Sequence, residues 1–528
     1  MSHHTVRTFG AFIVIAALVA AAHPAYAAAA CEGLTALTAS PGGAPLQVTL
    51  AKSVAAGAFT PPGPDGPPAA TSPYAALPAF CRVAVTLRPG PKSDVKAEVW
   101  MPASGWNGKL QVVGNGGFAG TIGYRALATA LANGYAAAGT DTGHSGPAAN
   151  TFATDDATLD FAYRAIHETA VAAKRAVDGF YGAAPKFSYF NGCSTGGRQA
   201  LTAAQRYPDD FTGIVGGAPA IYTTKQAFGQ LWFYQAIAVG DGAIPKEKLP
   251  LIHDAVLAAC DALDGAADGV LENPLACTFD PGVLACKPGA APASCLTAPQ
   301  VESVRRIYAG ASHAVTHEKI FPGLERGSEL GWSPVPVSYA VDYFKHIVYK
   351  NPSWDPSTLN FGSDVAEAYP AANQIFDAND PRLGAFTSRG GKLLMYQGWA
   401  EPGIPPGHVV NYLRGGESAH HGCRQRRAAL HGAGHGPLRR RRRRQHVRHG
   451  GGARPVGRVG HAARADSGVA RARRQGRSHA AAVRLSALRA LLRHRQHGRR
   501  FELQVHGAVR TKALGFGLWA LGMEGFRR

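Results

Sequence analysis

Residues 186–197 read KFSYFNGCSTGG, and this stretch decides which fold the chain adopts. Its first half alternates polar and aromatic side chains, which predicts a short, mostly buried strand. Residues 198–206 are typical of a helix, which Pro208 ends. A serine on a tight turn between a strand and a helix, flanked by glycines, is typical of a nucleophile elbow.

Ser194 is therefore the candidate nucleophile. The turn would lift its hydroxyl out of the sheet and point the N–H of Thr195 at a developing oxyanion. Glycines at 192, 196 and 197 would allow a strained backbone and a close approach of strand and helix. The alternative is a Ser/Gly turn without chemistry, because such short patterns also occur by chance.

Residues 81–220 alternate expected strands with expected helices, which favours a mostly parallel sheet covered on both faces. A long amphipathic helix is expected over 157–181. The glycine loop at 114–117 follows an early strand, where the N–H of Gly116 or Gly117 would supply the second oxyanion donor. A phosphate-binding loop or a plain turn is the alternative, but no P-loop lysine and hydroxyl follow. The expected strands are 95–101, 110–113, 134–139 and 186–190.

Asp141 and His144 also follow an expected strand, so a catalytic role has to be weighed for them. In this architecture the acid and the base come after the serine along the chain. We therefore expect both side chains to form structural hydrogen bonds.

The N-terminus has the pattern of a secretory signal over residues 1–27. Arg7 precedes an apolar run from Ala11 to Ala22, and a small-x-small cleavage site follows at 25–27. The run is too short to span a bilayer comfortably, and no other segment looks transmembrane. We expect export to the periplasm or the cell exterior. A lipidated Cys31 is the alternative, although the residues before it match that poorly.

Export to an oxidising compartment favours disulfides among the eight cysteines. Two pairs of cysteines are close enough in sequence for each disulfide to close a loop, and a third disulfide would attach the N-terminal segment to the rest of the chain. The sequence alone does not fix the connectivity, and no spacing makes a convincing zinc site. The pairs expected are Cys31 with Cys81, Cys260 with Cys277, and Cys286 with Cys295.

Residues 221–384 lose the strand–helix alternation and are expected to form a lid inserted between strands. Their aromatic side chains would line a pocket for a flat ring or, as is more common, form the core of the lid. Within the lid, CDALDGAADGV at 260–270 suits a hard cation with oxygen ligands, and a solvated acidic turn is the alternative. The expected calcium ligands are Asp261, Asp264 and Asp268, with the carbonyls of Ala266 and Val270.

A late strand is expected at 392–396, and Glu401 lies on the loop after it. That loop is where the carboxylate that orients a catalytic histidine belongs. Glu401 is therefore the candidate acid, and a surface glutamate is the alternative.

Over residues 30–412 the chain resembles the tannase/feruloyl esterase family, which includes bacterial enzymes that hydrolyse esters of aromatic acids. The resemblance implies an α/β-hydrolase fold, a large lid with calcium and a serine nucleophile. It also implies a disulfide between the cysteine before that serine and a cysteine just after the catalytic histidine. The family usually has Asp where this chain has Glu401. The motifs are GCSTGG at 192–197, GNGG at 114–117, TDTGH at 140–144, GGAPA at 216–220, the acidic loop, and YQGWAEP at 396–402.

The catalytic histidine of the family is missing. The family has Gly-His-Cys-Gly-Gly some tens of residues after the acid, and no His-Cys pair follows Glu401 here. In a neighbouring reading frame, the codons for 429–441 can spell this motif, and those for 493–505 can spell the usual C-terminus of the family. We infer a frame slip near 412–416. Nothing in the sequence positions the tail histidines, which are His420, His421, His431 and His435.

The basic charge lies in the same region. Residues 414–528 hold 28 of the 55 Lys+Arg and 4 of the 35 acids, which leaves 27 basic and 31 acidic residues before them. Such a tail is also typical of nucleic-acid or acidic-surface binding. The frame slip accounts for both the arginines and the lost motif, so we expect no nucleic-acid partner.

The sequence thus predicts an exported serine carboxylesterase acting on small aromatic esters, inactive as written because Ser194 lacks a base. A non-catalytic exported binding protein is the alternative. The expected parts are a signal at 1–27, the α/β-hydrolase core at 28–220 and 385–413, the lid at 221–384, and an Arg-rich tail at 414–528.

Overall fold

The computed structural model describes residues 30–39, 43–62, 72–152 and 154–415. The expected signal segment and all but the first two residues of the Arg-rich tail lie outside this part of the chain, as do Cys423 and the four tail histidines.

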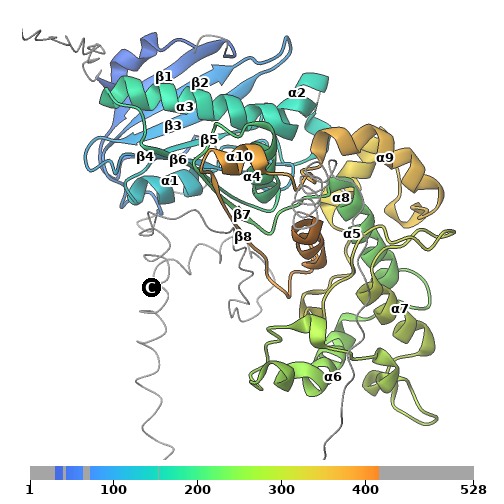
Figure 1. The fold of residues 1–528 in the computed structure, drawn as a ribbon. Coiled ribbons are helices and arrows are strands. Elements are labelled where there is room, and N and C mark those ends of the chain that lie inside the picture. Colours follow the sequence, from blue (N-terminus) through green and yellow to red (C-terminus); the bar gives the residue numbers. More distant parts are fainter. Residues whose placement is uncertain (1–29, 40–42, 63–71, 153, 416–528) are drawn as a thin grey trace, which may run out of the picture. The chain divides into compact units, whose positions relative to one another are not determined.

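Eight strands form one sheet in the order β1-β2-β3-β5-β4-β6-β7-β8 (Figure 1). The last five strands in that order run parallel to one another. The pairs β1–β2, β2–β3 and β3–β5 are antiparallel. The mostly parallel sheet is confirmed for the half that carries the elbow. The bounds are β1 Leu46–Val54, β2 Phe80–Leu87, β3 Val95–Pro102, β4 Lys109–Val113, β5 Ala136–Thr140, β6 Phe187–Cys193, β7 Gly213–Gly217 and β8 Lys392–Tyr396.

Helices cover both faces of the sheet, as predicted (Figure 1). α3 and α4 pack on one face, over side chains such as Val99 and Phe190. α1 packs on the other, against Trp100. Residues 407–415 form a further helix. The bounds are α1 Tyr124–Ala132, α2 Asp155–Leu159, α3 Ala165–Tyr181, α4 Thr195–Arg206, α5 Thr223–Ala238, α6 Leu249–Cys260, α7 Ala298–Ala309, α8 Ser338–Asp342, α9 Ser363–Phe376 and α10 Gly384–Ser388.

The long helix expected over 157–181 exists but is not uniform. A wide π-helical turn, Asp160–Arg164, joins α2 to α3. Such turns are rare and are often found at functional sites. Here the turn lies beside the nucleophile helix α4, whose Arg198 binds its carbonyl groups.

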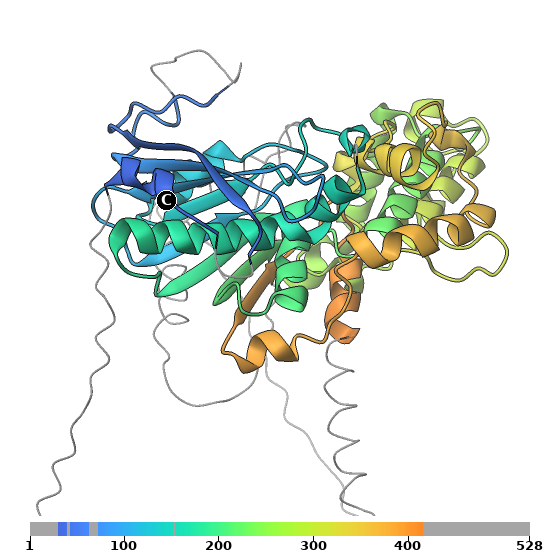
Figure 2. The ribbon, with the colours of Figure 1, turned by 90° about the horizontal axis from the view of Figure 1, so that it is seen from above.

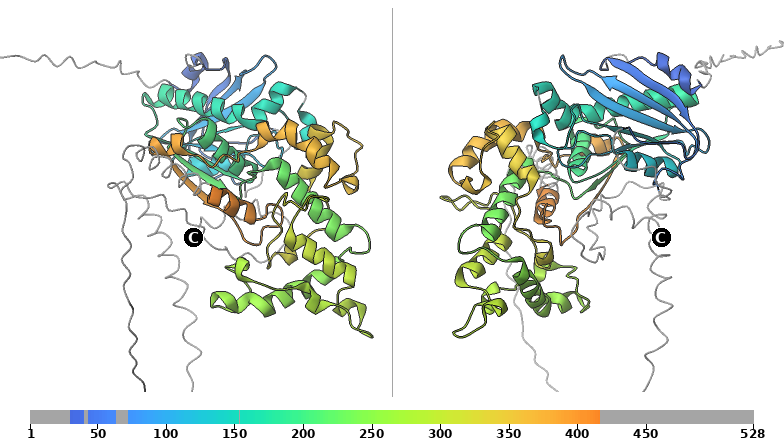
Figure 3. Two further views of the ribbon diagram at one scale, coloured as in Figure 1. Left: turned by 45° about the vertical axis from the view of Figure 1, so that its right-hand side comes forward. Right: turned by 180° about the vertical axis from the view of Figure 1, so that it is seen from behind.

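The lid contains α5 to α9, which lie together in Figures 2 and 3. Phe228, Tyr343 and Phe344 are fully buried in one cluster, which also takes in Phe118 and Phe161 of the sheet domain. The interpretation of the aromatic side chains as the core of the lid is therefore confirmed for these residues. The same cluster attaches the lid to the sheet domain.

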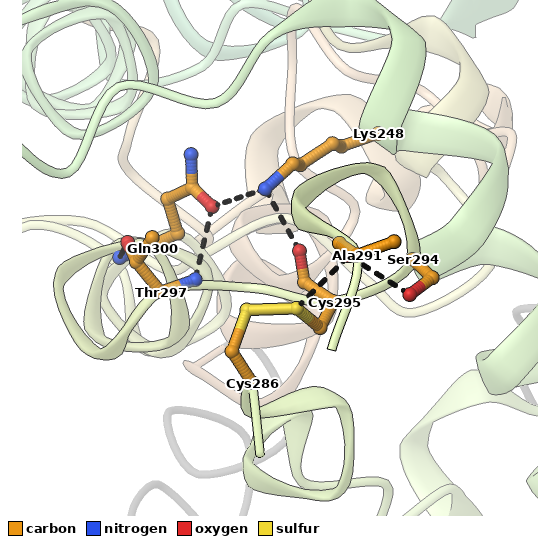
Figure 4. Close-up of a disulfide and its surroundings, with 7 residues drawn as sticks. All are labelled: Lys248, Cys286, Ala291, Ser294, Cys295, Thr297 and Gln300. Atoms are coloured by element: carbon orange, nitrogen blue, oxygen red, sulfur yellow. Dashed lines mark hydrogen bonds between the residues drawn. A yellow bond between two sulfur atoms is a disulfide. The ribbon is translucent and has the colours of Figure 1, made fainter. Parts of the chain in front are cut away.

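Three disulfides join the predicted pairs, Cys31–Cys81, Cys260–Cys277 and Cys286–Cys295. The third lies beside Lys248, whose ammonium donates to the carbonyl of Cys295 and to Oε1 of Gln300, both at 2.8 Å (Figure 4). This disulfide and the start of α7 are thus tied to the segment before α6. Among the described residues, no helix is long and apolar enough to cross a membrane.

Candidate active site

Ser194 stands between β6 and α4 with φ 61° and ψ −117°. A positive φ is rare for a residue with a side chain, costs about 1–3 kcal/mol, and persists only when the surroundings hold it. Its N–H donates to the carbonyl of Gly217 on β7 (2.9 Å), and its carbonyl accepts from the N–H of Ala220 (3.2 Å). The turn between strand and helix therefore has the geometry expected of a nucleophile elbow.

The glycines around Ser194 are required by space. A Cβ at Gly192 would lie 2.7 Å from the backbone of Gly196, and one at Gly197 would lie 2.4 Å from the carbonyl oxygen of Gly217. None of the glycines at 192, 196 and 197 has a positive φ. The predicted close approach of strand and helix is present, and the residue with the strained backbone is Ser194 itself.

The glycine loop lies directly beside the elbow. The Thr195 hydroxyl donates to the carbonyl of Gly117 (2.9 Å), and a Cβ at Gly114 would lie 2.7 Å from Cα of Gly196. Gln199 of α4 holds Asn115 twice, by accepting from its N–H (3.0 Å) and donating to its Oδ1 (3.2 Å). The two segments proposed to supply oxyanion donors, Thr195 and Gly116–Gly117, are thus brought together.

Glu401 lies on the loop after β8, as predicted. Its Oε1 accepts from the N–H of Gly403 (2.9 Å), and burial raises the pKa of its carboxyl. Gln230 of α5 donates to the carbonyl of Gly403 (2.6 Å). The lid therefore fixes the loop that presents Glu401.

His408 follows Glu401 and has a structural role that the sequence does not indicate. Its Nδ1 lies 2.5 Å from the carbonyl oxygen of Pro405 and its Nε2 2.7 Å from that of Pro219. The ring is 1% exposed and stacks on Phe321. His408 thus ties the Glu401 loop to the segment after β7, and both of its nitrogens face carbonyl oxygens instead of Ser194. The run Pro405-Pro406-Gly407-His408 carries no sequence signal for this role.

Asp141 and His144 are occupied by hydrogen bonds within their surroundings. Nε2 of His144 lies 2.7 Å from the carbonyl oxygen of Phe118, next to the glycine loop, and burial lowers the pKa of the ring. Asp141 accepts from the N–H groups of Lys96 (2.9 Å) and Gly143 (2.8 Å), and burial raises its pKa to about 7. The geometry agrees with the structural role expected for both.

Two contacts connect the lid to the elbow and the glycine loop. Tyr339 of α8 stacks on Phe118, with ring centroids 4.1 Å apart. Arg198 of α4 is fully buried and donates to the carbonyls of Phe161 (3.2 Å), Ala162 (2.8 Å) and, at 3.4 Å, Phe376 at the end of α9. The elbow is therefore buttressed from the lid side.

Cys193 is exposed and has no disulfide partner in the described part of the chain. Although the residue reaches the surface, desolvation of the thiol by its neighbours raises its pKa. A hydrogen bond with Tyr396 opposes this shift, and the nearby charge of Glu401 adds to it. The thiol next to Ser194 is thus left unpaired where the resemblance implies a disulfide.

The acidic loop has three carboxylates that turn back onto its own backbone. Asp261 accepts from the N–H of Gly269 (2.9 Å), Asp264 from that of Glu272 (2.8 Å), and Asp268 from that of Val270 (3.2 Å). Within the described residues, no three His, Cys, Asp or Glu side chains converge as a metal site would require. The expected ligands are nevertheless all oxygen atoms, which calcium prefers, and they lie on a loop closed by Cys260–Cys277.

Residues 81–340 match the family model of tannase and feruloyl esterase. An uncharacterized esterase of Xanthomonas campestris is 39% identical over 424 residues, covering 75% of this chain and 72% of that protein. The chain belongs to the tannase and feruloyl esterase family. A probable feruloyl esterase B-2 of Aspergillus flavus is 36% identical, over 60% of this chain and 62% of its own length. The chain thus spans about three fifths of the length of this fungal family member.

Solved structures of the family share the fold. Feruloyl esterase B from Aspergillus oryzae superposes with a TM-score of 0.67 at 30% identity, covering 74% of this chain and 78% of that one. Tannin acyl hydrolase from Aspergillus niger has a TM-score of 0.56 at 23% identity, covering 72% and 73%. The predicted α/β-hydrolase fold and the assignment to a family of carboxylesterases are confirmed.

Proposed function

We propose that the intact form of this protein hydrolyses esters of aromatic acids, with Ser194 as the nucleophile. The observation that carries the proposal is the strained turn at Ser194, held against the glycine loop by the bond from Thr195 to Gly117. Feruloyl, galloyl and similar esters form the proposed substrate class. Family membership and the names of the relatives support it.

The reaction proceeds in two halves. The Ser194 oxygen attacks the ester carbonyl carbon while a histidine takes its proton, and the N–H groups of Thr195 and of Gly116 or Gly117 stabilise the oxyanion. The alcohol leaves with that proton, and water then hydrolyses the acyl-enzyme. Glu401 orients the histidine. Its raised pKa reflects a desolvated carboxyl that an imidazolium partner would stabilise as the anion.

The chain as written lacks the histidine for this step. His408 is engaged by two carbonyl oxygens, and no described histidine contacts Ser194. Loss of the base of a catalytic triad costs about 10⁶-fold in kcat. We therefore infer that the printed chain is close to inactive and that the frame-corrected chain is the enzyme.

The test compares three purified proteins on methyl ferulate and methyl gallate. These are the printed chain, a chain whose codons after Tyr412 are returned to the neighbouring frame, and the corrected chain with Ser194→Ala. We expect turnover only from the second. Turnover by the printed chain that Ser194→Ala abolishes would overturn its assignment as inactive. A folded corrected chain without activity would favour the alternative of a non-catalytic binding protein.

Export and calcium binding belong to the same proposal. The three disulfides support an oxidising destination, because such bonds are rare in the cytosol. Calcium would be held by Asp261, Asp264 and Asp268 with the carbonyls of Ala266 and Val270. It would stabilise the lid and take no part in ester cleavage.

A further inference from the structure

The lid contains a hollow of about 460 Å³ that the catalytic proposal does not use. It opens between α5, the end of α7, and the segments 312–317 and 359–361. Its volume lies in the range of small-molecule sites, about 300–1,000 Å³. None of its lining residues belongs to the elbow, the glycine loop or the Glu401 loop.

The apolar side of the hollow is formed by Trp232, Leu359 and Phe361. The Trp232 indole N–H donates to the carbonyl of Arg306 (2.9 Å), and its ring meets that of Phe361 edge-to-face at 4.9 Å. Gln235 of α5 donates to the carbonyl of Leu359 (3.1 Å). These bonds hold the apolar side in place before any ligand arrives.

The polar side of the hollow is cationic. The Arg306 guanidinium lies 4.7 Å from the centre of the Trp232 ring, and among the described residues it forms no ion pair. Its neighbour Arg305, by contrast, pairs with Asp280 and Glu302. A guanidinium stacked on an indole has a fixed orientation and still presents its N–H edge to an anion.

His313 adds a second donor to this side. Its Nδ1 accepts from the N–H groups of Val315 and Thr316, both at 3.2 Å, so the ring proton is on Nε2. His317 also lines the hollow, and none of the lining residues is Asp or Glu. The hollow therefore joins apolar and aromatic surface to donors that suit a carboxylate.

We propose that this hollow binds a flat aromatic carboxylate. The carboxylate would accept from the N–H edge of Arg306 and from Nε2–H of His313, and the ring would lie against Trp232, Leu359 and Phe361. An ester of the same monocarboxylic acid carries no charge and loses both charge-assisted bonds. The hollow thus prefers a released aromatic acid to its ester, and binding requires neither Ser194 nor a catalytic histidine.

The experiment titrates the printed chain with 4-hydroxybenzoate and with methyl 4-hydroxybenzoate by isothermal calorimetry. We expect the acid to bind at least tenfold more tightly than the ester. Arg306→Gln should weaken acid binding at least tenfold, whereas the matched control Arg305→Gln should leave it unchanged. Thermal unfolding of both variants checks that they are folded, and Arg306→Lys should retain an intermediate affinity.

Equal affinity for acid and ester overturns the proposal, as does acid binding that persists in Arg306→Gln. No turnover is measured, so failure here is distinct from failure of the esterase assay. A corrected chain that hydrolyses esters but binds no acid through Arg306 keeps the first proposal and removes the second.

Discussion

Tyr339 of the lid stacks on Phe118 of the segment that follows the glycine loop, with ring planes 10° apart and centroids 4.1 Å apart. The carbonyl of the same Phe118 lies 2.7 Å from Nε2 of His144. The segment beside the proposed oxyanion donors is therefore held from the lid on one side and from the sheet domain on the other. The position of this segment therefore depends on its contact with the lid and on its contact with the sheet domain.

We expect Tyr339→Leu to lower the free energy of unfolding by about 1–2 kcal/mol, because it removes an aromatic stack and part of a packed ring. Urea denaturation followed by circular dichroism measures the change. Phe187→Leu is the control, since Phe187 is 45% exposed and should have little effect. Equal destabilisation by the two substitutions would show that the stack contributes nothing specific.

Arg198→Met should destabilise the protein by about 2–4 kcal/mol. The substitution leaves the carbonyls of Phe161 and Ala162 without a buried charged donor, and hydrogen bonds to charged groups contribute about 1.5–3 kcal/mol. Arg382→Gln is the matched control, because that side chain is 77% exposed and, within the described part of the chain, its ion pair is with Asp380 alone. Chemical denaturation should show no measurable change for the control. A stable Arg198→Met variant would contradict the role of the buried guanidinium.

Ionisation of Asp377 should make the free energy of unfolding depend on pH, in a direction that follows from its raised pKa. Burial raises its pKa to about 7, although it accepts backbone N–H bonds from Thr223 and Thr224. Since the folded pKa lies above the unfolded one, the folded state binds more protons between about pH 4 and pH 7, and this contribution to stability is lost as the pH rises. The variant Asp377→Asn keeps the neutral form at every pH. Its unfolding free energy relative to the parent should rise from pH 5 to pH 8, and a constant difference would contradict the shift.

Cys193 should react with a thiol reagent in the folded printed chain, because it is exposed and has no disulfide partner among the described residues. The reaction at pH 7 should be slower than that of free cysteine and should speed up as the pH rises, since the raised pKa reduces the thiolate fraction. A Cys423→Ser background isolates the signal, and Cys193→Ser should abolish it. In the frame-corrected chain the thiol should be protected by the restored disulfide, so equal labelling of both chains would count against that pairing.

Calcium should raise the melting temperature of the printed chain, and a chelator should reverse the shift. The acidic loop supplies three carboxylates, of which those of Asp264 and Asp268 are exposed, and a ligand that binds only the folded state stabilises it. Asp261→Asn combined with Asp264→Asn should remove the response. The variant Asp280→Asn, outside the loop, should keep it. A calcium response in the double variant would place the cation elsewhere.

Much of the fold followed from local patterns. The strand expected at 392–396 is β8, and the glycine-flanked Ser194 predicted the turn after β6. The antiparallel pairing of β3 with β5 was not predicted, because strand direction depends on partners distant in sequence. The wide turn at Asp160–Arg164 was not predicted either, because a single π-helical turn shifts the apolar spacing of a long helix by only one residue.

The part of the candidate site that could be predicted from the sequence is the part whose motifs specify a backbone geometry. Ser194, Thr195 and the glycine loop come together because short strands present them at one edge of the sheet. His408 could not be predicted, because its role arises from two carbonyls, one of them nearly two hundred residues away in sequence. The catalytic base and the calcium site remain predictions that rest on the sequence.

We expect the π-helical turn at Asp160–Arg164 and the Arg198 side chain that binds it to change together during evolution. A π-helical turn is commonly longer than an α-helical one by a single residue, so it behaves as a one-codon insertion within a helix. The carbonyls of this turn are bound by a guanidinium that lies on another helix. We expect a lineage that loses the extra residue also to lose its arginine at 198, and one that changes the arginine first to lose stability. A one-residue insertion or deletion at this turn would therefore carry information about a side chain on the helix that follows Ser194.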